Sequence, residues 1–410
     1  MVRVILAGLV VVTALVTYVI VLPVPDEVGD SPWMVKTAAL KWRLQYVLKL
    51  VTPIGINEWF DERAREDSRA AGPNVPYTDA VFDRVPVRIF TDEPVGGMTA
   101  KRPAIVYFHG GGWIRGSVDG YHPVTALLAR KLNLILVSVE YRLAPKYVFP
   151  TAIDDCTAAT VWFLEHLNEY NVDPARVALM GDSAGGNLAA ATAQRLTFDK
   201  KYRDLPKVKL QVLIYPALQA FDFKTPSYQQ YGDYSTLILD TEIATWMWSL
   251  YGHGRKDLGS LVKAKMTNNH TSAAAKRSPL VQECLSHGLI PDEFKQSGYE
   301  STSHDFGDEG IFEKIKGVLL DPDYAPLMRK DLRGLPEAYI LTAEYDVLRD
   351  DGIMYAKRLE KGGVPVTWKH YMKGYHGMFS LENRPLLSTT VGDKSVSDFI
   401  QFARQNLHEK

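Results

Sequence analysis

The chain has 410 residues, of which 46% are hydrophobic and 23% are charged, and its formal net charge is −1 at pH 7. This composition excludes a disordered chain, and the balanced charge excludes the basic footprint of a nucleic-acid-binding protein. The length favours one large domain with an appended segment, or two domains. The two cysteines, Cys156 and Cys284, are too few for a disulfide scaffold and lack zinc-binding spacing, so they form one bridge or stay free thiols.

The N-terminal region contains an uncharged apolar run at residues 4–22. A helix of this length crosses the ~30 Å hydrocarbon core of a bilayer, and no small-residue cleavage site follows, so we expect an uncleaved anchor and not a signal peptide. Arg3 precedes the run, and Asp26 and Glu27 follow it. The positive-inside rule therefore places residues 1–3 in the cytoplasm and predicts a single-pass type II membrane protein.

Two further features bear on the region beyond the membrane. Asn269 begins an Asn-His-Thr acceptor site for N-glycosylation, which fits a domain in the endoplasmic reticulum lumen or outside the cell. Residues 33–51 are basic and show apolar periodicity, so we expect a helix that lies on the membrane surface or packs on the folded domain. We expect residues 23–100 as a whole to be a linker and the N-terminal part of a cap.

From residue 101 to 410, short apolar runs alternate with helical stretches. Strands are predicted at residues 104–108, 134–139, 176–180, 209–215, 337–342 and 366–371, and helices at 121–131, 151–170, after 185, at 350–361 and at the C-terminus. This α/β pattern predicts a mostly parallel central sheet flanked by helices, with ligand-binding loops along the edge where the strands end. Residues 217–330 interrupt the alternation, and we expect them to form a helical cap over that edge.

A GxSxG motif spans residues 181–185, between a predicted strand and a predicted Ala-rich helix. This context is the one that a nucleophile elbow requires, in which a sharp turn exposes the serine hydroxyl at the sheet edge. The positive end of the following helix points at the same place. The motif therefore predicts Ser183 as a catalytic nucleophile.

A second motif, HGGGW, follows the strand at 104–108. Glycines allow backbone N–H groups to approach a substrate closely, and such groups stabilise the oxyanion of an acyl-transfer intermediate. We expect the oxyanion hole to use the N–H groups of Gly110, Gly111, Gly112 and Ala184. His109 precedes the serine, whereas the chain order in this fold is serine, acid, histidine, so we interpret His109 as structural.

Asp346 and His376 complete the predicted catalytic triad, because each follows a predicted strand at the same sheet edge. His376 would accept the proton of Ser183, and Asp346 would orient and stabilise the imidazole. His370 lies within a predicted strand and is interpreted as a packed residue. The other carboxyl groups within reach by sequence are those of Glu344, Asp350 and Asp351.

The strings FHGGGW, VEYRLAPKYVFP, GDSAGGN and AEYDVLRDDG together resemble the arylacetamide deacetylase group of the hormone-sensitive-lipase-like α/β-hydrolases, the GDXG lipolytic enzymes. The resemblance runs from about residue 100 to the C-terminus, and the N-terminal anchor fits it. It implies an α/β-hydrolase fold with a cap built from the N-terminal region and residues 217–330. It also favours Asp346 over Glu344, Asp350 and Asp351 as the acid of the triad. It also implies hydrolysis of carboxylic esters, or arylamides, of lipophilic molecules in the endoplasmic reticulum lumen, without a cofactor or metal.

Other functions fit the same fold. A non-catalytic ligand-binding or receptor protein arises when a triad member is missing, and here all three are present. A hydrolase for peptide or thioester substrates would use the same residues. The sequence does not distinguish the acyl chain, the leaving group or the oligomeric state.

Overall fold

The computed structural model describes Thr17 and residues 23–51, 72–91, 100–296, 298–301, 303–381 and 388–408. Apart from Thr17, the predicted anchor at residues 4–22 and the predicted cytoplasmic residues 1–3 lie outside these ranges. Within the ranges, no helix has both the length and the apolar character needed to cross a bilayer.

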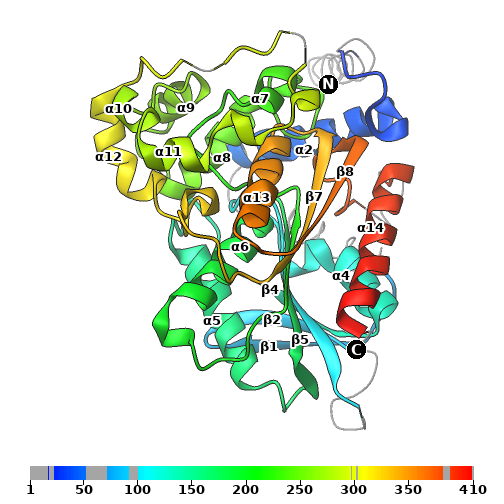
Figure 1. Ribbon diagram of the computed structural model, residues 1–410. Helices are drawn as coiled ribbons and strands as arrows, with labels where there is room; N and C mark the ends of the chain where they lie inside the picture. Colours follow the sequence, from blue (N-terminus) through cyan, green and yellow to red (C-terminus); the bar gives the residue numbers. More distant parts are fainter. Residues whose placement is uncertain are drawn as a thin grey trace.

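An eight-stranded sheet in the order β1-β2-β4-β3-β5-β6-β7-β8 forms the centre of the described chain (Figure 1). The strands are β1 (Tyr77–Phe82), β2 (Val85–Phe90), β3 (Arg102–Phe108), β4 (Ile135–Val139), β5 (Val172–Asp182), β6 (Leu210–Ile214), β7 (Glu337–Tyr345) and β8 (Val366–Tyr375). From β4 to β8 every neighbouring pair is parallel, while β1–β2 and β2–β4 are antiparallel. This arrangement confirms the predicted mostly parallel sheet.

Helices cover both faces of the sheet, and Figure 1 shows α4 and α14 on one side and α5 and α6 on the other. The described helices outside residues 217–330 include α2 (Pro32–Val51), α4 (Val118–Leu132), α5 (Thr151–Glu165), α6 (Ala184–Phe198), α13 (Arg349–Lys361) and α14 (Thr390–Ala403). Because both faces are covered, every residue of β3, β4 and β6 is buried. This explains why these strands appear in the sequence as continuous apolar runs.

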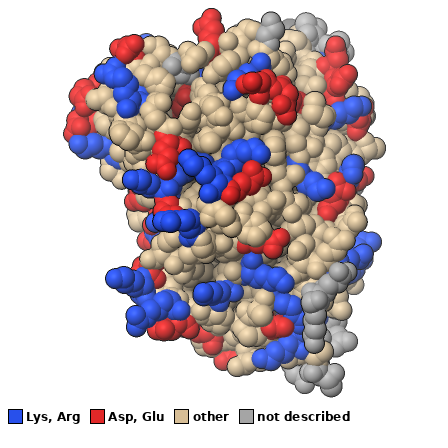
Figure 2. Space-filling model, viewed as in Figure 1, with Lys and Arg blue, Asp and Glu red and all other residues tan. Residues whose placement is uncertain are grey.

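Short turns of other helix types also occur in the described residues. They are the 3-10 turns η1 (Val28–Asp30), η2 (Lys200–Tyr202), η3 (His287–Leu289), η4 (Asp292–Phe294) and η5 (Pro326–Met328), and the π-helical turn η6 (Arg404–His408). The interior is continuous between the sheet and its helices, and both cysteines, Cys156 and Cys284, are free and buried in it. Lys and Arg side chains alternate with Asp and Glu over the face in Figure 2, in keeping with the small net charge.

The hairpin of β1 and β2 corrects the expectation that residues 23–100 form only a linker and a cap segment. These strands extend the central sheet through the β2–β4 pairing. The hairpin turn consists of Asp83 and Arg84, both at positive φ (40° and 69°). Such turns usually carry Asn-Gly or Asp-Gly, and β1 is largely exposed, so neither the turn chemistry nor an apolar run marked the hairpin in the sequence.

The helix predicted at residues 33–51 is α2, and the burial of its side chains shows which surface it packs on. Val35 and Ala39 are fully buried, and Ala38 nearly so. The helix therefore packs on the folded domain through these residues. Trp33, in its first turn, is 55% exposed.

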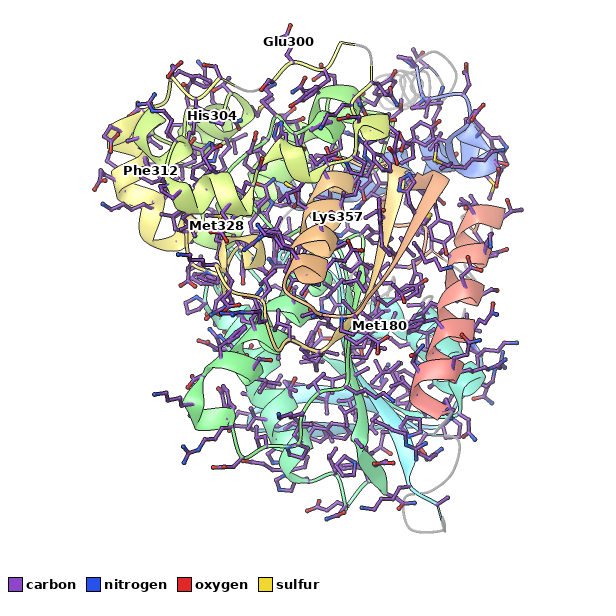
Figure 3. All side chains as sticks on the ribbon, viewed as in Figure 1. Met180, Glu300, His304, Phe312, Met328 and Lys357 are labelled. Atoms are coloured by element: carbon purple, nitrogen blue, oxygen red, sulfur yellow. The ribbon has the colours of Figure 1, made fainter. Side chains whose placement is uncertain are left out.

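Between β6 and β7 the chain forms a group of helices at one end of the molecule (Figure 1). They are α7 (Pro226–Tyr231), α8 (Thr241–His253), α9 (Leu258–Met266), α10 (Ala273–Lys276), α11 (Pro279–Cys284) and α12 (Glu309–Leu319). Figure 3 shows Glu300, His304 and Phe312 in this group, well away from Met180 in the centre of the sheet. We refer to residues 217–330 as the cap.

Aromatic stacking joins the cap to the loop after β3. The ring of Trp113 lies parallel to that of Tyr251, with centroids 4.5 Å apart, and 4.4 Å from the ring of Trp248. Tyr324 packs on both Trp248 and Tyr251, and its hydroxyl donates to the Trp248 carbonyl oxygen. All four residues are buried, so the aromatic residues of the cap form its core together with the HGGGW loop.

We predict that Phe82→Ala destabilises the protein by about 3–5 kcal/mol, because a fully buried ring leaves a cavity when it is truncated. The ring stacks on Trp162 with centroids 4.0 Å apart. The neighbouring Val81, which is 61% exposed, gives a matched control, and Val81→Ala should change stability by less than about 0.5 kcal/mol. Urea unfolding followed by fluorescence measures both, and equal shifts in the two variants would contradict the hairpin's position in the sheet.

Candidate active site

Ser183 lies in a sharp turn between β5, which ends at Asp182, and α6, which begins at Ala184. Its φ of 56° and ψ of −119° are strained for a non-glycine residue. A Cβ atom at Gly181 would lie 2.2 Å from the carbonyl oxygen of Gly185, and one at Gly185 would lie 1.9 Å from that of Phe108. Both glycines of the motif are therefore required by close backbone packing, which holds the serine in this conformation.

The structure brings the three predicted triad residues together. His376 follows the end of β8, and its Nε2 lies 2.9 Å from Ser183 Oγ. Its Nδ1 lies 2.8 Å from Asp346 Oδ2, and Asp346 follows the end of β7 and is fully buried. Leu348 N–H donates to the second carboxylate oxygen, Asp346 Oδ1, at 2.9 Å, which holds the carboxyl group in place. A serine, an imidazole and a carboxylate thus form one hydrogen-bonded chain.

The other three carboxyl groups near Asp346 have different partners. Glu344 contacts Arg349 Nη1 at 2.9 Å and His370 Nε2 at 3.1 Å. Burial opposes ionisation of Glu344, but the hydrogen bond from His370 and the charge of Arg349 outweigh it, so its pKa is lowered. Asp350 pairs with Arg349 Nε at 2.9 Å. Asp351, whose pKa burial raises to about 8, accepts hydrogen bonds from the start of the cap. None of these three described carboxyl groups forms a hydrogen bond with His376, whose partners are Asp346 and Ser183. His370 is a packed strand residue, as expected.

The HGGGW loop corrects one predicted oxyanion donor. The N–H of Gly110 donates to Asp182 Oδ1 at 2.9 Å and is therefore occupied. The N–H groups of Gly111 and Gly112 donate to no other described residue. The N–H of Ala184 belongs to the first residue of α6, where helix geometry leaves it unpaired. Three of the four predicted groups are thus available to bind an oxyanion.

Asp182 is a site residue that the sequence analysis missed. Its side chain is buried and accepts hydrogen bonds from the Tyr107 hydroxyl (2.9 Å) and the Tyr121 hydroxyl (3.0 Å), in addition to Gly110 N–H. Burial raises its pKa to about 6. Asp182 is only a variable position of GxSxG, and its partners lie on β3 and α4, so no local pattern could have revealed the contacts. The carboxyl group links the turn at Ser183 to the HGGGW loop.

His109 has the structural role that the chain order suggests. Its ring stacks on that of Tyr141 with centroids 4.3 Å apart, and its Nδ1 lies 2.8 Å from the Gly110 carbonyl oxygen. Burial lowers its pKa to about 4, so the ring is neutral near pH 7. Its Nε2 has no hydrogen-bond partner among the described residues. His109 therefore shapes the loop and does not contact Ser183.

Cap side chains border the triad and the HGGGW loop. A Cβ atom at Gly112 would lie 2.2 Å from Met247 Sδ, so α8 lies directly against the loop. Ile238 Cδ1 lies 3.3 Å from the Cβ position of the glycine that follows His376. The ring of Tyr215 lies 4.9 Å from that of His376. An aliphatic side chain of the cap and the aromatic ring of Tyr215 thus lie beside the imidazole.

The predicted glycosylation site lies far along the cap, after α9. The side chain of Asn269 is exposed, and its Nδ2 donates to Thr267 Oγ1 at 3.1 Å. Thr271, the third residue of the acceptor sequence, is buried and donates to the Asn268 carbonyl oxygen.

Comparison with known proteins shows what this chain is similar to. A family model described as the alpha/beta hydrolase fold matches residues 105–279 and 309–380. Neutral cholesterol ester hydrolase 1 of Rattus norvegicus is 40% identical over 408 residues, which cover 96% of this chain and 97% of that protein. Arylacetamide deacetylase of Bos taurus is 36% identical over 413 residues, which cover 98% of each.

Solved structures give the same result for the fold. The hyperthermophilic esterase of Pyrobaculum calidifontis has a TM-score of 0.62 and 27% identity, covering 88% of this chain and 97% of that one. The esterase LipW of Mycobacterium marinum has a TM-score of 0.61 and 26% identity, covering 87% and 90%. The chain therefore belongs to the α/β-hydrolase family and, within it, to the group of ester hydrolases that includes neutral cholesterol ester hydrolase and arylacetamide deacetylase.

Proposed function

We propose that this protein is a membrane-anchored serine hydrolase that cleaves carboxylic esters, or arylamides, of lipophilic molecules through an acyl-enzyme on Ser183. The observation that carries the proposal is the hydrogen-bonded chain from Ser183 Oγ through His376 to Asp346. The names of the two relatives, an ester hydrolase and a deacetylase of arylacetamides, support this substrate class. The complete triad speaks against a non-catalytic binding protein.

In this mechanism His376 Nε2 takes the proton of Ser183 while Oγ attacks the carbonyl carbon of the substrate. The carbonyl oxygen gains negative charge and is stabilised by the N–H groups of Gly111, Gly112 and Ala184. His376 then gives the proton to the leaving oxygen or nitrogen, and the acyl group stays on Ser183. Water attacks the acyl group in the same manner and restores the serine.

Asp346 and Asp182 act in this scheme through other groups. Asp346 accepts the Nδ1–H of His376, which presents Nε2 to the serine and stabilises the imidazolium that forms. Asp182 holds Gly110, and thereby sets the position of the two glycine N–H groups that follow. We regard Asp182 as a positioning residue, because its contacts are with the loop and not with the reacting atoms.

The proposed location rests on residues outside the triad. The uncharged run at residues 4–22 would span the membrane of the endoplasmic reticulum once, with the catalytic domain in the lumen. The exposed side chain of Asn269 is accessible to the glycosylation machinery there, which supports this orientation.

We predict that Ser183→Ala lowers kcat/KM for a short-chain aryl ester by about 10⁴-fold or more, because the nucleophile is lost. Labelling by a fluorophosphonate probe should disappear in parallel. The thermal unfolding midpoint of the variant serves as the control for folding. Labelling that persists in the folded variant would show that another residue is the nucleophile.

We predict that Asp182→Asn lowers kcat by about 10²-fold with little change in KM, because oxyanion donors act mainly in the transition state. The side-chain NH₂ group of the asparagine would face hydroxyl or N–H groups that now donate hydrogen bonds to the Asp182 carboxylate. Tyr121→Phe removes one of these donors and should have a smaller effect. Steady-state kinetics of the three proteins test this, and a rise in KM alone would contradict the positioning role.

We predict that Asn269→Gln abolishes a glycosidase-sensitive mass difference in protein expressed in animal cells, because the acceptor sequence requires asparagine at this position. Thr271→Ser keeps the acceptor sequence and should retain the glycan. Gel mobility before and after glycosidase treatment measures both variants. A glycan in the Gln variant, or none in the natural chain, would count against the use of this site.

A further inference from the structure

The first described residues after the predicted anchor contact the loop that carries the catalytic base. Gly29, in η1, lies against the strand end before His376, and a Cβ atom there would be 3.0 Å from Tyr375 Cε1. Asp30 Oδ1 lies 3.0 Å from Lys373 Nζ, and Asp30 also accepts a hydrogen bond from the Thr390 hydroxyl. The chain that follows the anchor is thus attached to β8 and α14. We call residues 23–43 the entry segment.

The entry segment also contacts the cap beside the triad. Thr236 is buried, and its hydroxyl donates to the carbonyl oxygen of Pro23. Two residues later, Ile238 lies against the glycine that follows His376. Arg43, on α2, pairs with Asp240, which caps the N-terminus of α8. Since α8 lies against Gly112, these contacts connect the entry segment both to the surroundings of the base and to the HGGGW loop.

Chain length limits how far the predicted membrane helix can lie from the triad. Gly29 follows Pro23 by six positions, and six residues span at most about 22 Å when fully extended. Pro23 directly follows the apolar run at residues 4–22. Gly29 itself touches the residue before His376. If this run spans the membrane, the membrane surface therefore lies no more than about 30 Å from the catalytic base.

Exposed apolar side chains occur on the same elements. Of the four large hydrophobic residues that are exposed in the described part of the chain, Trp33 (55%) is on α2 and Met372 (66%) is on β8. The other two, Tyr77 and Val81, lie on β1. Tryptophan is enriched where proteins meet the membrane–water interface. Figure 1 shows α2 at the end of the molecule where α7 and the upper ends of β7 and β8 lie.

We propose that this end of the molecule rests on the bilayer, so that the active site is held at the lipid surface. The inference rests on the proposed membrane anchoring and serine hydrolysis. The partner surface is a lipid bilayer, contacted by Trp33 and Met372. The entry segment holds the active-site side of the domain toward the membrane through its contacts at Thr236, Lys373 and Asp240.

The test uses the full chain reconstituted in phosphatidylcholine vesicles with two substrates. One is a long-chain acyl ester of a sterol dissolved in the bilayer, and the other is the water-soluble p-nitrophenyl acetate. A flexible Gly/Ser insertion of about 20 residues between Leu22 and Pro23 lengthens the tether by about 25 Å and leaves the contacts of the entry segment intact. We expect turnover of the sterol ester to fall about fivefold or more, because the site spends less time at the lipid surface. Turnover of the soluble ester should not change.

Two matched variants sharpen the result. The same insertion after Gly334, in an exposed turn where a side chain would meet no neighbour within 4 Å, controls for the added residues and should leave both rates unchanged. Trp33→Glu should lower sterol ester turnover about threefold, because a charge is disfavoured at the interface. Val81→Glu, an equally exposed position on β1, should have no such effect.

The outcomes separate this inference from the function on which it rests. Absence of soluble ester turnover in the natural chain would reject the proposed serine hydrolase. Release of the natural chain from vesicles by an alkaline wash would reject the anchor, and with it this inference. An anchored, active enzyme whose ratio of sterol ester to soluble ester turnover is the same with and without the tether insertion would overturn the inference alone.

Discussion

The strained turn at Ser183 is the constraint on which the site depends. Its positive φ persists because the chain on either side is packed backbone against backbone, Gly181 on Gly185 and Gly185 on the end of β3. Such strain is stable only where the surrounding structure over-determines it. The buried parallel strands supply that rigidity, since every residue of β3 and β6 is covered on both faces. The fold thus holds the serine hydroxyl at the one edge where the loops of His376 and Asp346 also end.

The same turn directs two neighbouring side chains into different tasks. Ser183 contacts His376, while Asp182 contacts Gly110 and the tyrosines beneath the HGGGW loop. The proposed nucleophile and the proposed oxyanion donors are consequently positioned by one segment of backbone, although they follow different strands. The raised pKa of Asp182 shows that its burial is costly, and the three donors that surround it offset much of this cost. The burial of this carboxyl group indicates that the position of the HGGGW loop is maintained at some expense of stability.

Much of this arrangement could be predicted from the sequence, and the exceptions have physical causes. Buried strands, the GxSxG turn and the order of Ser183, Asp346 and His376 all leave local patterns, so the parallel sheet and the residues of the hydrogen-bonded chain were found. The hairpin at Asp83 leaves no pattern, because its turn and its exposed strand depend on pairing within the sheet. The occupied N–H of Gly110 could not be predicted either, since its acceptor, Asp182, becomes a neighbour only when β3 and β5 pair.

The stack of Trp113, Trp248, Tyr251 and Tyr324 has a consequence for how proteins of this kind can diversify. Caps are often regarded as interchangeable modules that are exchanged on a constant scaffold. Here the cap shares its aromatic core with the HGGGW loop, which carries the proposed oxyanion donors, so a foreign cap would remove the rings that pack against Trp113. Recombination that replaces the cap alone would therefore disturb chemistry as well as selectivity. Cap and loop form one heritable unit, and lineages that change substrate are expected to change both together or neither.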